Sequence, residues 1–104
     1  MASLIVKKQT EGRIVTLQPI GELDLNTAPE LESVVRETCD EEPGEVVLDL
    51  SRISLADTVG VRVLLRCREI FDAQDCGFWV MSAGSRLRRD LERYGVLGAL
   101  PLRG

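Results

Sequence analysis

Residues 46–65 read VVLDLSRISLADTVGVRVLL, and this stretch decides the fold class. Its first five residues are aliphatic apart from Asp49, which is typical of a short strand covered on both faces of a sheet. Residues 51–56 are expected to form a loop. Asp57 then stands directly before a segment with helical spacing, so we predict that it caps a helix from about residue 58 to residue 74. A strand, a loop and a helix in succession point to an α/β fold.

Two strands joined by a tight turn are predicted at the start of the chain. Residues 4–7 and 14–20 have the composition of strands, and Glu11-Gly12 supplies a turn between them, so a β-hairpin is expected. Pro19 has no N–H group to donate to a ladder, which places the end of the second strand at an edge or a bulge.

Helices and strands alternate after the hairpin. Thr27 is predicted to cap a helix, with Glu30 three residues later completing a capping box. The other elements are expected at residues 78–81 (strand), 86–93 (helix capped by Ser85) and 96–102 (a last short strand). The order β-β-α-β-α-β-α predicts one domain over residues 1–104, with a mixed sheet and helices packed against it.

The composition excludes several classes of function. The 104 residues are 44% hydrophobic and 29% charged, as in an ordinary globular domain. The 13 Lys+Arg against 17 Asp+Glu give a net charge of −4, which argues against direct nucleic-acid binding because phosphate neutralisation requires a basic face. The absence of His excludes a His-ligated metal site and a Ser-His or Cys-His catalytic pair. We expect no enzyme activity, no metal and no cofactor.

The cysteines and the hydropathy pattern indicate where the protein works. Cys39, Cys67 and Cys76 are odd in number and lack C-x-x-C spacing, which fits a reducing compartment better than a disulfide framework. The chain begins without the apolar core of a signal peptide, and no stretch approaches the roughly 18 apolar residues of a membrane span. We therefore expect a cytoplasmic protein without membrane insertion.

The tetrapeptide Asp57-Thr58-Val59-Gly60, after an aliphatic strand and a hydrophobic loop, resembles the signature of the STAS domain family. That family is the fold of bacterial anti-sigma factor antagonists, and its pattern at this point is Asp-Ser-Ser/Thr-Gly. Residues 21–31 are similar to the family's first loop and helix, and residues 85–96 give a third, weaker match. The three matches stand in the expected order and together cover most of the chain.

The resemblance implies a regulatory binding protein. Members of this kind bind an anti-sigma factor of the serine/threonine-kinase type when unphosphorylated and thereby release a sigma factor. Phosphorylation of the hydroxyl residue after the Asp, here Thr58, weakens that binding. The family's acidic loop residue corresponds to Asp24, which is expected to lie beside Thr58 and to contact the kinase. Any ATP would belong to the kinase.

The sequence departs from the family pattern at two positions near Thr58. Val59 replaces the second hydroxyl residue. Arg62 stands where phosphorylated members often have Gly; it could block the usual partner, select a different one, or pair with a phosphate on Thr58. Thr58 itself is expected at the first helical position, where the helix dipole is positive and a phosphate is tolerated.

Helical periodicity divides the 58–74 helix into two faces. The predicted core stripe consists of Gly60, Val63, Leu64, Cys67, Ile70 and Phe71. A second set is expected to point outward as a docking patch: Thr58, Val61, Arg62 and Leu65. Together with Asp24 and Asp57, this patch forms the predicted partner-binding site.

One alternative function stays open. The chain could instead be a STAS interaction subunit of a transport or stress-signalling complex that is not phosphorylated.

The arginines of the 86–93 helix are expected to form an ordinary solvated face, since Asp90 and Glu92 are interleaved and the protein is acidic overall. These arginines are Arg86, Arg88, Arg89 and Arg93. The sequence leaves the oligomeric state open.

Overall fold

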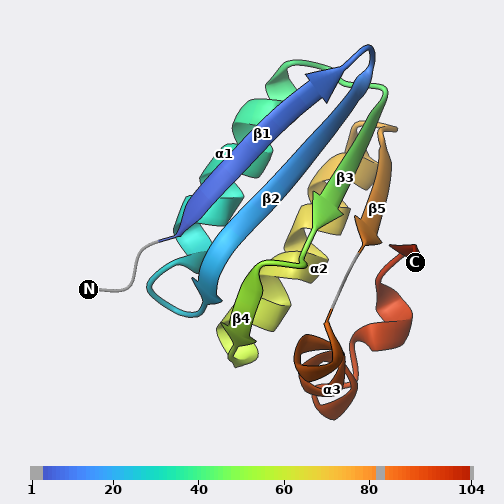
Figure 1. The fold of residues 1–104 in the computed structure, drawn as a ribbon. Helices are drawn as coiled ribbons and strands as arrows, with labels where there is room; N and C mark the ends of the chain where they lie inside the picture. The colour runs from blue at the N-terminus through green and yellow to red at the C-terminus, as the bar shows by residue number, and fades with distance from the viewer. Residues whose placement is uncertain (1–3, 82–83, 104) are drawn as a thin grey trace.

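The computed structural model describes residues 4–81 and 84–103, without the side chains of Ser85 and Arg103. Figure 1 shows the arrangement of its elements. In chain order they are β1 (Ile5–Glu11), β2 (Ile14–Leu23), α1 (Ala28–Asp40), β3 (Glu45–Asp49), β4 (Ile53–Ala56), α2 (Thr58–Ala73), β5 (Gly77–Met81), α3 (Ser85–Arg93), a 3-10 turn η1 (Leu97–Ala99) and β6 (Leu102–Arg103).

The strands form one mixed sheet in the order β1-β2-β3-β5-β6, with β4 paired to β2. β1 and β2 are the predicted antiparallel hairpin, and Gly12 at their turn has φ +62°, a conformation that glycine adopts without strain. The other pairings are parallel. The predicted mixed α/β fold is therefore confirmed.

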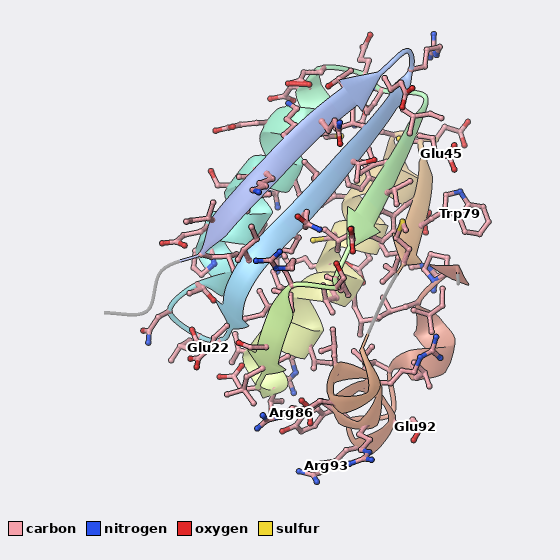
Figure 2. The ribbon with its side chains drawn as sticks, viewed as in Figure 1. Glu22, Glu45, Trp79, Arg86, Glu92 and Arg93 are labelled. Atoms are coloured by element: carbon pink, nitrogen blue, oxygen red, sulfur yellow. The ribbon has the colours of Figure 1, made fainter. Side chains whose placement is uncertain are left out.

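Helices α1 and α2 cover the same face of the sheet, and α3 lies at the lower end beside β4 (Figure 1). Side chains along β3 alternate between buried and half-buried, so only one face of this strand is covered. Val46 and Leu48 face the helices, whereas Val47 is half-buried on the other face. The expectation that this strand is covered on both faces was wrong. Trp79 on β5 is likewise half-buried (Figure 2).

The segment predicted as a loop at residues 51–56 contains strand β4. β2 extends beyond Pro19 to Leu23 and pairs with β3 over residues 14–17 and with β4 over residues 21–23. Pro19 thus lies where the neighbouring strand changes, and the pairing register shifts between Gly21 and Glu22. The proline marks a change of partner rather than the end of the strand.

Two predicted helix caps differ in detail. Thr27 is the N-cap residue of α1, but its hydroxyl donates to the carbonyl of Glu22 at 2.7 Å rather than capping the helix. Glu30 accepts from the backbone N–H of Leu4 at 2.9 Å, so no capping box forms. Helix α3 begins at Ser85 itself, with Gly84 at the N-cap position.

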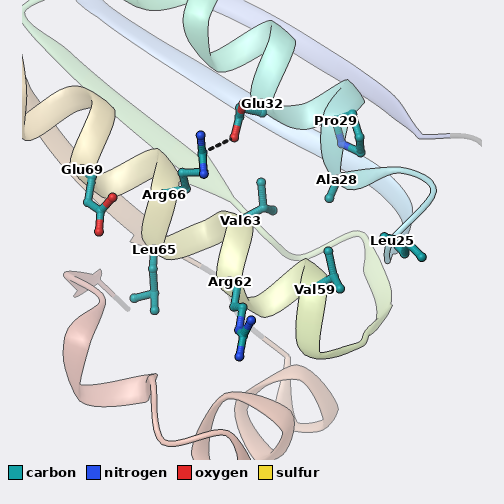
Figure 3. Close-up of a pocket in the computed structure, with 10 residues that line it drawn as sticks. All are labelled: Leu25, Ala28, Pro29, Glu32, Val59, Arg62, Val63, Leu65, Arg66 and Glu69. Carbon is teal, nitrogen blue, oxygen red and sulfur yellow. Dashed lines mark ion pairs between the residues drawn. The ribbon is translucent and has the colours of Figure 1, made fainter.

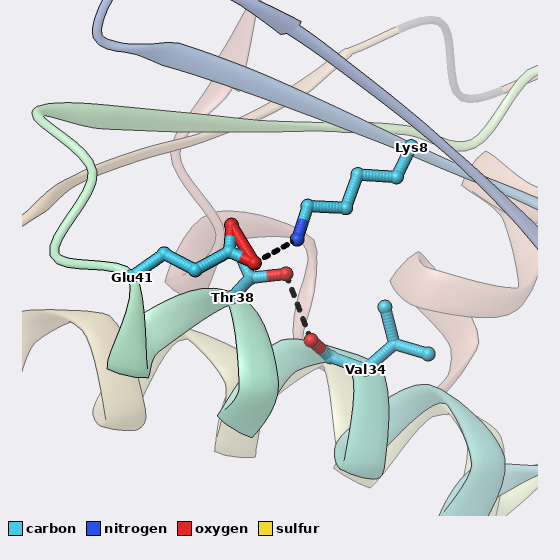
Figure 4. Close-up of polar contacts among 4 residues, drawn as sticks. All are labelled: Lys8, Val34, Thr38 and Glu41. Atoms are coloured by element: carbon cyan, nitrogen blue, oxygen red, sulfur yellow. Dashed lines mark hydrogen bonds and ion pairs between the residues drawn. The ribbon is translucent and has the colours of Figure 1, made fainter.

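Two polar contacts lie at the C-terminal half of α1 (Figure 4). The buried hydroxyl of Thr38 donates to the carbonyl of Val34 at 2.8 Å, which satisfies a polar group inside the core. Lys8 of β1 forms an ion pair with Glu41, just after the helix. The first contact lies within α1, and the second joins the end of α1 to the hairpin.

Candidate functional site

Asp57 organises the N-terminus of α2. Its Oδ1 accepts from the N–H of Gly60 at 2.8 Å, which confirms the predicted cap. Its Oδ2 accepts from the N–H of Leu25 at 3.4 Å, and its own N–H donates to the carbonyl of Leu23 at 3.1 Å. One residue therefore ties the start of α2 to the end of β2 and to the loop that precedes α1.

Gly60 allows α2 to approach β2 closely. A Cβ atom at this position would lie 2.0 Å from the carbonyl oxygen of Leu23 and 2.7 Å from its carbonyl carbon. No side chain fits at that separation, so glycine is required by contact rather than by backbone angles. The close approach fixes where Thr58 emerges at the surface.

Asp24 lies in the neighbouring loop and is half-buried. Its Oδ1 accepts from the N–H groups of Asn26 at 2.9 Å and Thr27 at 3.1 Å. Its carbonyl accepts from the N–H of Ala28 at 2.8 Å. Asp24 precedes Leu25 and Thr58 follows Asp57, and Leu25 and Asp57 are hydrogen-bonded, so the loop that carries Asp24 meets the start of α2 at this point.

The predicted outward patch is only partly outward. Thr58 and Arg62 are exposed and Leu65 is half-buried, but Val61 is 1% exposed, which contradicts its predicted place on the surface. Val61 belongs to the same core cluster as Leu87 and Leu91 of α3. Helix α2 packs against α1, β2, β4 and β5, and its buried residues span a wider arc of the helix than the predicted stripe.

An exposed apolar surface that the sequence patterns did not reveal adjoins Thr58. Val59 is 38% exposed and Leu25 is 66% exposed. Both line a shallow groove of about 480 Å³ between α1 and α2, shown in Figure 3. Its other lining residues are Ala28, Pro29, Glu32, Arg62, Val63, Leu65, Arg66 and Glu69. Valine in place of a second hydroxyl residue, and leucine in a polar loop, are the signals that could have indicated this surface.

The charged residues of α2 differ in how they are paired. Arg66 forms an ion pair with Glu32 of α1 at 2.6 Å, and Arg68 pairs with Asp72 at 3.5 Å. Among the residues that the structure describes, Arg62 has no ion-pair partner and lies one turn after Thr58. The exposed side of the site thus combines a hydroxyl, apolar side chains and an uncommitted cation.

The cysteines take no part in this site. All three are free; Cys39 is half-buried, whereas Cys67 and Cys76 are buried. Burial raises the pKa of the Cys67 thiol to about 12, which keeps it protonated and unreactive. Within residues 4–81 and 84–103, His, Cys, Asp and Glu form no group of three or more that could hold a metal ion. No helix in that part of the chain is long and apolar enough to cross a membrane.

Comparison with known proteins agrees with the resemblance seen in the sequence. A family model described as "STAS domain" matches residues 6–103. The anti-sigma-F factor antagonist RsfB of Mycobacterium tuberculosis is 31% identical over 94 residues, which cover 90% of this chain and 76% of RsfB. A solved anti-sigma factor antagonist from Mycobacterium paratuberculosis is 26% identical, with a TM-score of 0.83 over 95% of this chain and 84% of that chain.

A more distant structure shares the fold. The anti-sigma factor antagonist SpoIIAA in its unphosphorylated form gives a TM-score of 0.77 over 95% of this chain and 86% of that chain, and its 17% identity shows the fold alone. The same protein has also been solved in a phosphorylated form. RsfB and the Mycobacterium paratuberculosis protein are named for their effect on an anti-sigma factor, in agreement with the prediction that the chain is not an enzyme.

Proposed function

The chain belongs to the STAS domain family, and on that premise we propose that it is an anti-sigma factor antagonist switched by phosphorylation of Thr58. It binds a cytoplasmic anti-sigma factor of the serine/threonine-kinase type and thereby frees a sigma factor. The observation that carries the proposal is the exposed Thr58 at the first position of α2, directly after a fixed Asp57 cap. Relatives named as anti-sigma factor antagonists support it.

The docking face comprises exposed and half-buried groups around the start of α2. Thr58, Arg62 and Leu65 come from α2, and Val59 and Leu25 supply apolar area beside them. Asp24 and Asp57 fix the loop before α1 against the start of α2. They present their remaining carboxylate surface to the kinase. Val61 lies in the core, where it holds α2 in its orientation, and it does not touch the partner.

Phosphorylation of Thr58 opposes docking in two ways. A phosphate adds about −1.5 to −2 charges at the centre of the face, and the positive end of the α2 dipole accommodates it within the free protein. Arg62, four residues later on the helix, then pairs with the phosphate and is withdrawn from the partner. The same residue therefore favours the modified chain and supports binding of the unmodified one.

The alternative role, a STAS subunit of a transport or stress-signalling complex, uses the same fold without the switch. Relatives above 25% identity are named as anti-sigma factor antagonists, which favours the first role. A gene for a kinase-like anti-sigma factor beside the gene for this chain would favour it further.

Binding and release are the direct tests of this proposal. A purified anti-sigma kinase from the same genome, loaded with its sigma factor, is titrated with the chain without ATP. We expect a complex to form with displacement of the sigma factor, and Thr58→Glu to abolish both. A chain that binds none of the genome's anti-sigma kinases, or binds one without displacing its sigma factor, would contradict the proposal.

A further inference from the structure

Helix α3 carries a stripe of three arginines on the side away from the core. Arg86, Arg89 and Arg93 follow at i, i+3 and i+7, so they share one face of the helix, and all three are exposed. Leu87 and Leu91 are buried on the opposite side and hold this face outward. Figure 2 shows Arg86 and Arg93 projecting from the lower end of the molecule.

The stability of α3 accounts for only one of the three arginines, Arg93, which stands in the last turn where the helix dipole favours a cation. Within the described part of the chain, none of the three guanidinium groups has an ion-pair partner, although Asp90 and Glu92 lie on the same helix. Like charges at i, i+3 and i, i+4 repel each other. Arg86 also stands in the first turn, where the helix dipole disfavours a cation and no acidic residue compensates.

The charge of α3 contrasts with that of the remaining chain. The nine residues of α3 hold four of the 13 basic residues but only two of the 17 acidic ones. A chain with a net charge of −4 therefore presents one compact basic face. An acidic surface that is repelled elsewhere on the molecule would be attracted at this helix.

The stripe continues the docking face around Thr58. α3 packs against β4, the strand that leads directly into α2. Arg62 extends from α2 on the side where α3 lies (Figure 3). The uncommitted cation of α2 and the arginines of α3 thus lie at the same end of the molecule.

We propose that the arginine stripe of α3 is a second docking surface for acidic side chains of the same protein partner, in extension of the face around Thr58. This inference rests on the proposed function for the identity of the partner. The stripe steers the partner electrostatically, while the α2 face carries the phosphorylation switch. A protein is favoured over nucleic acid because the chain as a whole carries a net charge of −4 and would repel a long run of phosphates.

The first test is a titration of the anti-sigma kinase with an Arg86→Gln/Arg89→Gln/Arg93→Gln variant at low and high salt. We expect about a tenfold loss of affinity at low salt that shrinks at high salt. As a control, a Lys7→Gln/Lys8→Gln/Arg13→Gln variant removes three positive charges near the hairpin, and it should lose little affinity for the kinase. The α3 variant should also unfold at about the same denaturant concentration, because relief of repulsion among the arginines offsets the lost interaction of Arg93 with the helix dipole.

The second test needs no partner. Poly-L-glutamate is added to the isotope-labelled chain, and the NMR chemical shifts of the backbone amides are recorded. We expect these shifts to change on α3 and near Arg62, and we expect no such change in the α3 variant. If poly-L-glutamate causes these shifts but no anti-sigma kinase binds the chain, the proposed function is rejected and the inference that α3 binds an acidic partner still stands. Unchanged affinity in the α3 variant, or tighter binding of duplex DNA than of poly-L-glutamate through these arginines, would overturn the inference.

Discussion

Replacing Gly60 by alanine probes the contact that positions the candidate site. The new Cβ would lie 2.0 Å from the carbonyl oxygen of Leu23, whereas ordinary contacts begin at 3.4 Å, so α2 must move by more than an ångström. Such overpacking costs about 1–3 kcal/mol. The movement also weakens the cap between Asp57 and residue 60, worth about 1 kcal/mol. Alanine recovers about 1 kcal/mol through its higher helix propensity. We expect the free energy of unfolding to fall by about 1–3 kcal/mol.

Urea unfolding followed by the fluorescence of the single tryptophan, Trp79, measures this change. Gly98→Ala is the matched control, because a Cβ there meets nothing within 4 Å and Gly98 has no positive φ. The control should change the free energy of unfolding by less than about 0.5 kcal/mol. If Gly60→Ala is as mild as the control, the packing of α2 against β2 is not as described.

Further predictions concern the same region. Asp57→Ala removes the acceptor of two backbone amides and should lower the free energy of unfolding in urea by about 1–2 kcal/mol, with a smaller loss for Asp57→Asn. Val61→Ala opens a cavity and should cost about 2 kcal/mol in the same assay; no loss would mean that Val61 is exposed after all. Arg62→Gly should weaken binding to the anti-sigma kinase and narrow the affinity gap between the unmodified chain and Thr58→Glu, and tighter binding would contradict this role for Arg62. The pKa of the Cys67 thiol rises from 9.0 to about 12 on folding, so this thiol ionises more easily in the unfolded chain. Its contribution to stability is complete below pH 9 and is lost as the pH rises toward 12; Cys67→Ala should flatten that loss in alkaline unfolding curves, and an unchanged slope would contradict it.

Features encoded by neighbouring residues could be predicted from the sequence. Gly12 supplies a turn conformation that only its own backbone determines, so the hairpin is visible in the sequence. The Asp57 cap is likewise local, because it joins a side chain to an amide three residues later. Helix α2 and its cap place Thr58 correctly at the start of the helix.

Features that depend on distant segments could not be predicted in this way. Val61 is buried because α1 and three strands pack around α2 and cover a wider arc of the helix than its own periodicity predicts. β4 forms because β2 continues past Pro19 and offers backbone groups to a second neighbour. Glu30 leaves the expected capping box because the N–H of Leu4 is within its reach. In each case a tertiary partner replaced the local one that the sequence pattern suggested.

Phosphorylation of the chain by its anti-sigma kinase tests the proposed switch most directly. The chain is incubated with the purified kinase and ATP, the modified residue is mapped by mass spectrometry, and the affinity of the modified chain for the kinase is measured. We expect one phosphate on Thr58, none on Thr58→Val, and a large loss of affinity in the modified chain. Phosphate found only on other residues, or a modified chain that binds as tightly as the unmodified one, would contradict the switch.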